Sequence, residues 1–271
     1  MDMRTATNAS RPIPEVVLLS AGPGDLELLT IKAARALASA DVLLLDELVD
    51  PRIAELAPGA RVIRVGKRGG CRSTPQAFIC RLMRRHALQG ARVVRVKGGD
   101  ALLFGRAGEE IQFLRDAGIT VRIINGISAG FAAAASLGVS LTHRDHCHGI
   151  TFVTAHTHDH GEPDWAALAA TGTTLAIYMG MNRIESIATS LRAHMPMDTP
   201  VAVVLSASRA DEATCVTTLA RLTEHARGLE PGQPGVILVG TVLAQAAVAA
   251  EAGIPWRAPK GERGVADACA E

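Results

Sequence analysis

The chain has 271 residues, 48% hydrophobic and 20% charged, which suits one large or two small α/β domains with buried cores. Its formal net charge of +1 and its 3% of aromatic residues exclude a globally basic or base-stacking surface, so we expect no nucleic-acid partner. The apolar runs are too short to span a membrane, so we expect no membrane association. Five cysteines without a CxxC pair, and no signal-peptide core at the start, predict a cytoplasmic protein.

The first half alternates short apolar strands with helices, and a glycine-rich or charged loop follows nearly every strand. The pattern predicts helices over 28–37, 76–89, a stretch ending near 117, and an Ala-rich stretch opened by 125–130. It predicts strands at 16–20, 42–45, 61–65, 121–124, and from 93 up to the paired glycines 98 and 99. Such alternation indicates a parallel sheet with a ligand crevice along its carboxyl edge.

The second half begins after a segment without periodicity at 141–149, which we interpret as a linker. Helices are predicted over 164–170 and 182–194, and strands over 150–154, 174–178, 201–205, 214–218 and 236–239, with 214–218 pairing as a hairpin strand. This divides the chain into a tail (1–14), an N-terminal α/β domain (15–140), the linker, a C-terminal α/β domain (150–248) and a second tail (249–271).

Charged residues follow two of the early strands. Asp46 ends the second strand, where its carboxylate serves either as a helix cap or loop hydrogen-bonder or as a functional group of the crevice. Lys67, Arg68 and Arg72 lie among glycines after the third strand, which favours either a local anion-binding loop or a solvated basic loop. The loop after the first strand lacks GxGxxG, which argues against a nicotinamide cofactor.

A cluster of histidines spans the predicted linker and the following strand. None of the known zinc spacings is matched, so we expect a solvent-exposed His-rich loop and no metal. The cluster consists of His143, His146, Cys147, His148, His156, His158 and His160.

These loops together resemble the tetrapyrrole methylase family, and within it the stand-alone members that C-methylate uroporphyrinogen III. The likeness covers about residues 16–243. It is carried by Ala21-Gly22-Pro23-Gly24-Asp25, Gly66-Lys67-Arg68, Lys97-Gly98-Gly99-Asp100, Phe104-Gly105-Arg106 with Gly108-Glu109-Glu110, Leu141-Thr142-His143-Arg144-Asp145 and Tyr178-Met179-Gly180.

The resemblance implies two α/β domains, the N-terminal sheet mostly parallel and the C-terminal one mixed, with S-adenosyl-L-methionine in the cleft between them. It implies two successive methyl transfers to uroporphyrinogen III, which give precorrin-2 for sirohaem, cobalamin or d-type haem synthesis and leave S-adenosyl-L-homocysteine. It also implies that the protein is a homodimer and that its binding partner is this small tetrapyrrole substrate.

Site residues carry over from the resemblance by matched position. The expected cofactor-binding residues are Pro23, Gly98, Gly99, Asp100, Leu103, Ser128, Ala129, Met179 and Ala207. The expected catalytic residues are Asp46, Lys67 and Arg106, with Arg106 as an orienting charge because a guanidinium is a poor base. The expected substrate-binding residues, which face a molecule with eight carboxylates, are Arg68, Arg72, Glu109 and Arg144.

Two segments depart from the family pattern. Ala101 and Leu102 stand where Pro and a bulky residue usually follow Gly-Gly-Asp, so we expect a less rigid turn there. Leu205-Ser206-Ala207 stands where Glu-Asn-Gly or Glu-Asn-Ala is usual, which removes a contact if that Glu touches a ligand. The alternatives are a methyltransferase of the same fold acting on a corrin precursor, and a non-catalytic tetrapyrrole-binding relative.

Overall fold

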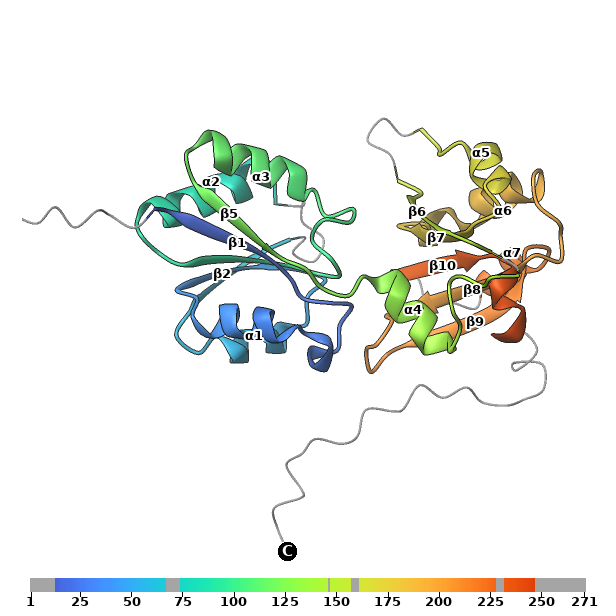
Figure 1. The fold of residues 1–271 in the computed structure, drawn as a ribbon, viewed down its shortest axis with the longest axis horizontal. Helices are drawn as coiled ribbons and strands as arrows, with labels where there is room; N and C mark the ends of the chain where they lie inside the picture. Colours follow the sequence, from blue (N-terminus) through green and yellow to red (C-terminus); the bar gives the residue numbers. More distant parts are fainter. Residues whose placement is uncertain (1–12, 67–73, 146, 157–160, 228–231, 247–271) are drawn as a thin grey trace, which may run out of the picture. The chain divides into compact units, whose positions relative to one another are not determined.

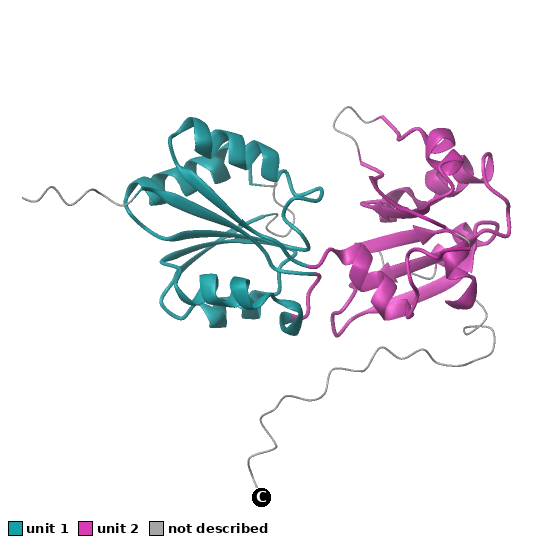
Figure 2. Ribbon diagram, in the orientation of Figure 1, with its two compact units in different colours: residues 1–22, 26–126 teal, residues 23–25, 127–271 magenta. Residues whose placement is uncertain are grey.

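The computed structural model describes most of the chain. The described residues are 13–66, 74–145, 147–156, 161–227 and 232–246. Contacts divide the chain into two compact units, residues 1–22 with 26–126 and residues 23–25 with 127–271 (Figure 2). Within the described ranges, no helix combines the length and the apolar character needed to cross a membrane.

The first unit is built on a parallel sheet of five strands in the order β3-β2-β4-β1-β5. The strands are β1 (Glu15–Ser20), β2 (Val42–Asp46), β3 (Arg61–Val65), β4 (Val93–Lys97) and β5 (Thr120–Ile124). Central strand β4 is buried at every residue, as expected when helices cover both faces of a parallel sheet. The predicted parallel sheet is confirmed.

Helices cover both faces of this sheet (Figure 1). One face packs against α1 (Ile31–Ala38) and the 3-10 helices η1 (Leu26–Leu28) and η2 (Pro51–Leu56), and the other against α2 (Gln76–Leu88) and α3 (Ala107–Asp116). We expected the first helix to run from residue 28, but α1 begins at Ile31. The reason is a cap, because the Thr30 hydroxyl accepts a hydrogen bond from the N–H of Ala33 at 3.1 Å.

The second unit is built on a mixed sheet in the order β6-β7-β10-β8-β9. The strands are β6 (Ile150–Thr154), β7 (Thr174–Tyr178), β8 (Pro200–Leu205), β9 (Ala213–Thr218) and β10 (Gly235–Val239). β6 and β7 pair in parallel, and the other pairs are antiparallel, including the predicted hairpin of β8 and β9. The predicted mixed sheet is therefore confirmed as well.

Helices also cover both faces of the second sheet. On one face lie α5 (Trp165–Ala170), α6 (Ile184–Arg192) and α7 (Leu222–Ala226), with the 3-10 helix η3 (Met181–Arg183) leading into α6. On the other face lie α4 (Ala129–Leu137) and the 3-10 helix η4 (Thr241–Leu243).

The two units divide at Gly126, earlier than the boundary we expected at residue 140. Helix α4 packs against β10, and its alanines share a core with Leu141 and Cys147, which are 8% and 4% exposed. The segment 141–149 is thus part of the second unit and is not a linker between the two. An Ala-rich helix is apolar all round, so its sequence does not reveal which sheet it covers.

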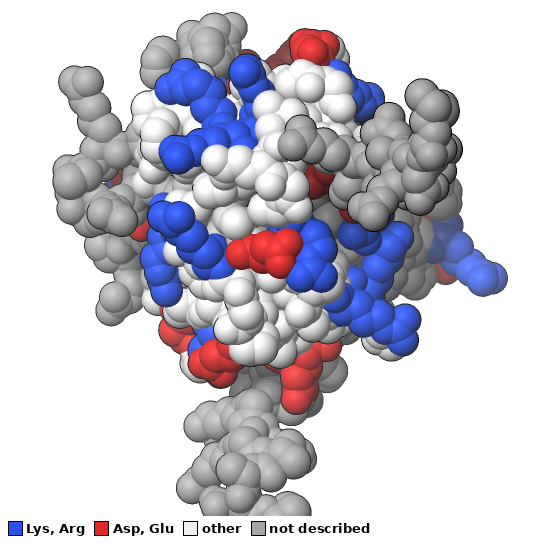
Figure 3. Space-filling view, turned by 90° about the vertical axis from the view of Figure 1, so that its left-hand side faces the viewer, with Lys and Arg blue, Asp and Glu red and all other residues white. Residues whose placement is uncertain are grey.

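Charge is distributed over the surface in keeping with the near-neutral composition. On the face shown in Figure 3, Lys and Arg side chains form separate groups divided by uncharged and acidic side chains. The described residues on this face form no continuous basic stripe of the kind that tracks a nucleic-acid backbone.

Candidate functional site

The loops after β1 and β4 are joined by their backbones at the carboxyl edge of the first sheet. The N–H of Gly22 donates to the carbonyl of Gly99 at 3.1 Å, and the N–H of Gly99 donates to the carbonyl of Gly22 at 2.7 Å. Both residues have a positive φ, 75° and 63°, which glycine adopts without strain. Two residues predicted to bind the cofactor, Gly98 and Gly99, therefore lie in a turn fixed against the first glycine loop.

The carboxylate of Asp100 ties this turn to the loop after β5. Its Oδ1 accepts from the N–H of Leu102 at 2.8 Å, and its Oδ2 accepts from the N–H of Gly126 at 3.1 Å. A Cβ on Gly126 would lie 2.7 Å from the Cβ of Ser20 and 3.0 Å from the carbonyl oxygen of Gly99, so the close approach needs glycine. Asp100 thus joins the loops after β4 and β5 at this edge, in addition to any contact with a ligand.

Backbone strain is concentrated in the loops that follow β4, β7 and β8. Among the residues the structure describes, the non-glycine residues with positive φ are Phe104 (54°), Arg106 (55°), Met179 (55°), Ser206 (48°) and Ser208 (67°). Such conformations cost energy and are found preferentially at functional sites. Two of them, Arg106 and Met179, are residues that the sequence analysis selected.

Arg106 and Glu109 form a bidentate ion pair at the start of α3. Arg106 Nε donates to Glu109 Oε1 at 2.8 Å, and Nη2 donates to Oε2 at 2.7 Å. Both side chains are 56% exposed. The hydrogen bond with Glu109 raises the pKa of Arg106, so the guanidinium stays charged and suits an orienting role.

Asp46 lies at the carboxyl end of β2 and opens into a pocket of about 620 Å³. Its side chain is 35% exposed. Apolar residues of β3 and α2 line part of the pocket, and charged or titratable residues line the rest, among them Glu47, Arg61, Arg64, Arg85 and His86. Burial, together with the charges of Arg61 and Arg85, lowers the pKa of His86. A pocket with arginines beside a carboxylate suits an acidic ligand, and the sequence analysis missed Arg61, Arg64 and Arg85.

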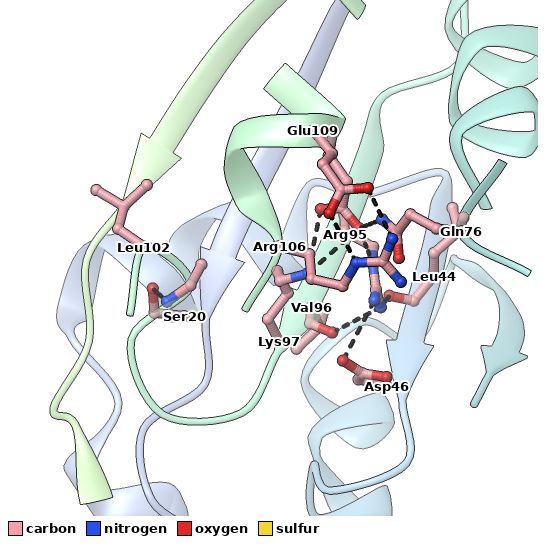
Figure 4. A network of polar contacts seen from close by, with 12 residues as sticks. Ser20, Leu44, Asp46, Gln76, Arg95, Val96, Lys97, Leu102, Arg106 and Glu109 are labelled. Atoms are coloured by element: carbon pink, nitrogen blue, oxygen red, sulfur yellow. Dashed lines mark hydrogen bonds and ion pairs between the residues drawn. The ribbon is translucent and has the colours of Figure 1, made fainter. Parts of the chain in front are cut away.

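Asp46 is the partly exposed end of a buried ionic network that the sequence analysis missed (Figure 4). Arg95 Nη2 donates to Asp46 Oδ2 at 3.2 Å, and Arg95 Nε donates to Glu110 Oε1 at 3.3 Å. Lys97 Nζ donates to both carboxylate oxygens of Glu110 at 3.2 Å. The signal in the sequence is the pair Arg95 and Lys97, two cations on one face of a strand that otherwise reads as core.

Burial shifts the pKa of Lys97 and of the neighbouring Cys80. It lowers the pKa of Lys97, and the neighbouring charge of Arg95 lowers it further. Burial also raises the pKa of the Cys80 thiol, and the negative charge of Glu110 adds to that shift. The network therefore lies in a region where solvent screens charges weakly.

In the second unit, the phenol of Tyr178 holds the start of α4 against the end of β7. Tyr178 Oη lies 2.7 Å from the hydroxyl of Ser128 and accepts from the N–H of Gly130 at 2.7 Å. Burial raises the pKa of Tyr178, so the phenol remains neutral. Two predicted cofactor residues, Ser128 and Ala129, thus lie in a segment that Tyr178 positions.

Met179 and Ala207, the remaining predicted cofactor-binding residues of the second unit, lie in loops that contain residues with positive φ. Met179 is 49% exposed, which leaves its side chain available to a ligand. Ala207 is buried between Ser206 and Ser208. The loop that contains Pro23 joins this region, because the N–H of Asp25 donates to the Ser208 hydroxyl at 3.2 Å.

Some of the other predicted site residues lie outside the described residues, and the rest differ in exposure. Lys67, Arg68 and Arg72 lie outside the described residues, Leu103 is half-buried, and Arg144 is exposed in the second unit. His146, His158 and His160 also lie outside the described residues. Among the residues that are described, no group of three or more His, Cys, Asp or Glu side chains could hold a metal ion.

Comparison with known proteins gives a consistent result. The family model described as Tetrapyrrole (Corrin/Porphyrin) Methylases matches residues 15–223. A uroporphyrinogen-III C-methyltransferase from Pseudomonas aeruginosa is 51% identical over 229 residues, which cover 84% of this chain and 94% of the relative. Siroheme synthase 2 from Aeromonas hydrophila is 43% identical over 239 residues, which cover 87% of this chain and 50% of that longer relative.

A solved structure resembles the whole fold. The uroporphyrin-III C-methyltransferase from Thermus thermophilus complexed with S-adenyl homocysteine superposes with a TM-score of 0.74 at 38% identity, covering 85% of this chain and 99% of that chain. The fold and the matched sequence agree. The chain belongs to the family of tetrapyrrole (corrin/porphyrin) methylases.

Proposed function

We propose that the protein transfers methyl groups from S-adenosyl-L-methionine to two ring carbons of uroporphyrinogen III in succession, giving precorrin-2 and S-adenosyl-L-homocysteine. The observation that carries this proposal is the 51% identity to the Pseudomonas aeruginosa uroporphyrinogen-III C-methyltransferase, 94% of which is covered. The sirohaem route is supported by the siroheme synthase relatives. The family resemblance implies cobalamin and d-type haem synthesis as alternative routes.

The residues present fit the cofactor in each unit taken separately. In the first unit, the Gly98-Gly99 turn offers bare backbone beside Leu102 and Phe104, which are 51% and 37% exposed. In the second unit, Met179 is 49% exposed and itself has a positive φ of 55°. Apolar side chains with a few placed polar groups are typical of small-molecule sites, and they suit an adenine ring and a methionine chain.

The chain's own contribution to catalysis is alignment and charge. The cofactor supplies an electrophilic methyl group on a sulfonium with a neutral leaving group, so little covalent help is needed. Asp46 is positioned to accept or hold a proton of the substrate where its carboxylate faces the pocket. Arg106, held charged by Glu109, supplies a fixed cation for substrate carboxylates, and the pocket arginines add further ones.

The remaining residues and the assembly belong to the same proposal. Lys67, Arg68, Arg72 and Arg144 would bind further carboxylates or, for Lys67, donate a proton. A homodimer in the cytoplasm is the form that the family resemblance and the cysteine pattern predict. Light scattering after size exclusion, and cell fractionation, would check these two points.

The activity is tested by incubating the purified protein anaerobically with uroporphyrinogen III and S-adenosyl-L-methionine labelled in its methyl group. We expect mass spectrometry to find two labelled methyl groups in the tetrapyrrole. Bound cofactor without label in the product would exclude this substrate and favour a corrin precursor, to be sought with a substrate panel. Failure to bind S-adenosyl-L-methionine in calorimetry would favour a non-catalytic tetrapyrrole carrier.

A further inference from the structure

Two positively charged side chains point into the core from the central strand of the first sheet. Arg95 and Lys97 are two residues apart on β4, so both face the layer formed by α2 and α3. They are 2% and 3% exposed. Ordinary core strands place apolar side chains at such positions, because a buried charge costs several kcal/mol unless it is paired.

Glu110 of α3 balances these two cations. Its side chain is fully buried, and it accepts hydrogen bonds from Arg95, Lys97 and, at 2.8 Å, from Nε2 of Gln76. The carboxylate therefore has donors from β4 and α2 at the same time. The bond from Nε of Arg95 to Glu110 fixes one side of the guanidinium.

The other nitrogens of Arg95 are also engaged. Nη1 donates to the carbonyls of Val96 at 3.2 Å and Leu44 at 3.4 Å, and Nη2 donates to Asp46. Figure 4 shows the side chain of Arg95 beside Asp46. On its other side the guanidinium donates to Glu110 through Nε. Because each nitrogen is engaged, the orientation of the guanidinium is fixed, with Nη2 directed toward Asp46.

Asp46 is the member of this network that reaches solvent. Its Oδ1 accepts from the N–H of Glu47 at 3.3 Å, while Oδ2 accepts from Arg95. The two bonds restrict the carboxylate plane but leave it facing the pocket. Replacing a complete buried ionic network by apolar residues is often neutral or stabilising, so stability alone does not account for these charges.

We propose that Arg95 is a positioning residue, which holds the carboxylate of Asp46 in the orientation needed for methyl transfer, and that Glu110 and Lys97 hold Arg95 in place. The inference rests on the proposed function, in which Asp46 faces the substrate. The negative charge of Glu110 also contributes to the raised pKa of Arg106. Glu110 therefore bonds Arg95 directly and adds a negative charge near Arg106.

A double-mutant cycle tests this assignment. Arg95→Lys, Asp46→Asn and the double variant would be compared with the wild type by single-turnover methyl transfer and by the affinity for uroporphyrin III, measured by fluorescence. We expect Arg95→Lys to lower the transfer rate about 10-fold to 100-fold, with little change in cofactor affinity. In the Asp46→Asn background the same change should lower the rate less than about threefold, because the group it positions is already altered.

The matched control is Arg122→Lys. Arg122 forms an ion pair with Glu15 at 2.8 Å at the surface of the same sheet, with both side chains about 40% exposed. We expect this change to have the same small effect in both backgrounds. A merely structural role of Arg95 would likewise give equal factors in the two backgrounds, for rate and for uroporphyrin III affinity, and that result would overturn the inference.

Two further outcomes remain distinguishable. A wild-type protein that transfers no methyl group contradicts the proposed function itself, whereas an active wild type with an equally active Asp46→Asn variant overturns only the positioning role. If Arg95→Lys does not fold, Arg95→Met replaces it in the cycle, because this variant keeps the buried pair of Lys97 and Glu110 and leaves Asp46 partly exposed to solvent. We expect that variant to bind cofactor and to lower the transfer rate much more in the wild type than in the Asp46→Asn background.

Discussion

The N–H of Ala101 donates a hydrogen bond to the hydroxyl of Ser20 at 2.9 Å, and both residues are buried. The contact joins the end of β1 to the turn after β4. Proline, which the family resemblance leads one to expect at position 101, has no N–H to donate. The turn therefore gains a side-chain hydrogen bond at the position where it lacks the ring of a proline.

Ser20→Ala should destabilise the protein by about 1–3 kcal/mol, because the buried N–H of Ala101 loses its acceptor. Chemical denaturation would measure this loss. The double variant Ser20→Ala with Ala101→Pro removes donor and acceptor together and should recover most of it, since an Asp-Pro pair is compatible with the Asp100 turn. A double variant no more stable than Ser20→Ala would show that the hydrogen bond does not substitute for proline.

Gly126→Ala should destabilise the first unit and weaken cofactor binding. The added Cβ meets Ser20 and the carbonyl of Gly99 at distances that force the loops after β1, β4 and β5 apart. We expect a loss of about 1–3 kcal/mol in chemical denaturation. Gly59→Ala is the matched control, because nothing lies within 4 Å of its Cβ position. Equal stability of the two variants would contradict the close approach.

Arg106→Ala should abolish turnover while S-adenosyl-L-methionine still binds. The side chain is 56% exposed, and its ion-pair partner among the residues that the structure describes is the equally exposed Glu109, so its removal should leave the fold intact. Calorimetry and the labelled-methyl assay would separate binding from turnover. Arg122→Ala, which breaks a comparable surface pair, is the control and should retain activity. Normal turnover of Arg106→Ala would remove this residue from the proposed site.

The ion pair of Asp41 with Arg92 should make the stability of the folded state depend on pH. Hydrogen bonds from the side chain and the backbone of Arg92 lower the pKa of Asp41 from 3.8 to about 2. A carboxyl group with a lowered pKa in the folded state stabilises it above its unfolded pKa, and the contribution is lost as the pH falls from about 4 to 2. Urea denaturation should thus show Asp41→Asn to be less stable than the wild type at pH 7, with a gap that closes toward pH 2.

Asp198→Asn serves as the reference for this measurement, because Asp198 is also exposed. The effect of Asp41 should be small, since the Asp41 side chain is 42% exposed and solvent screens the pair. A constant difference between Asp41→Asn and the wild type across this pH range would contradict the assignment.

The sequence by itself determined most of the architecture, because strand and helix periodicities are local properties. Buried strands with loops of glycine and charge at their carboxyl ends predicted the parallel sheet, and the hairpin of β9 with β8 was recognisable from its spacing. The resemblance of the loops then selected Asp46, Arg106 and Met179. Of these, Asp46 lies on a pocket, and the other two have strained backbone.

Only the tertiary structure decided which residues share an environment. Nothing in the sequence shows that Arg95 and Lys97 of β4 meet Glu110 of α3, since the pairing depends on how the helix packs across the strand. Nor does it show that α4 belongs to the second unit, because an apolar helix fits either sheet. Local pattern therefore sets the elements, whereas the contacts that orient Asp46 arise from packing between residues distant in the chain.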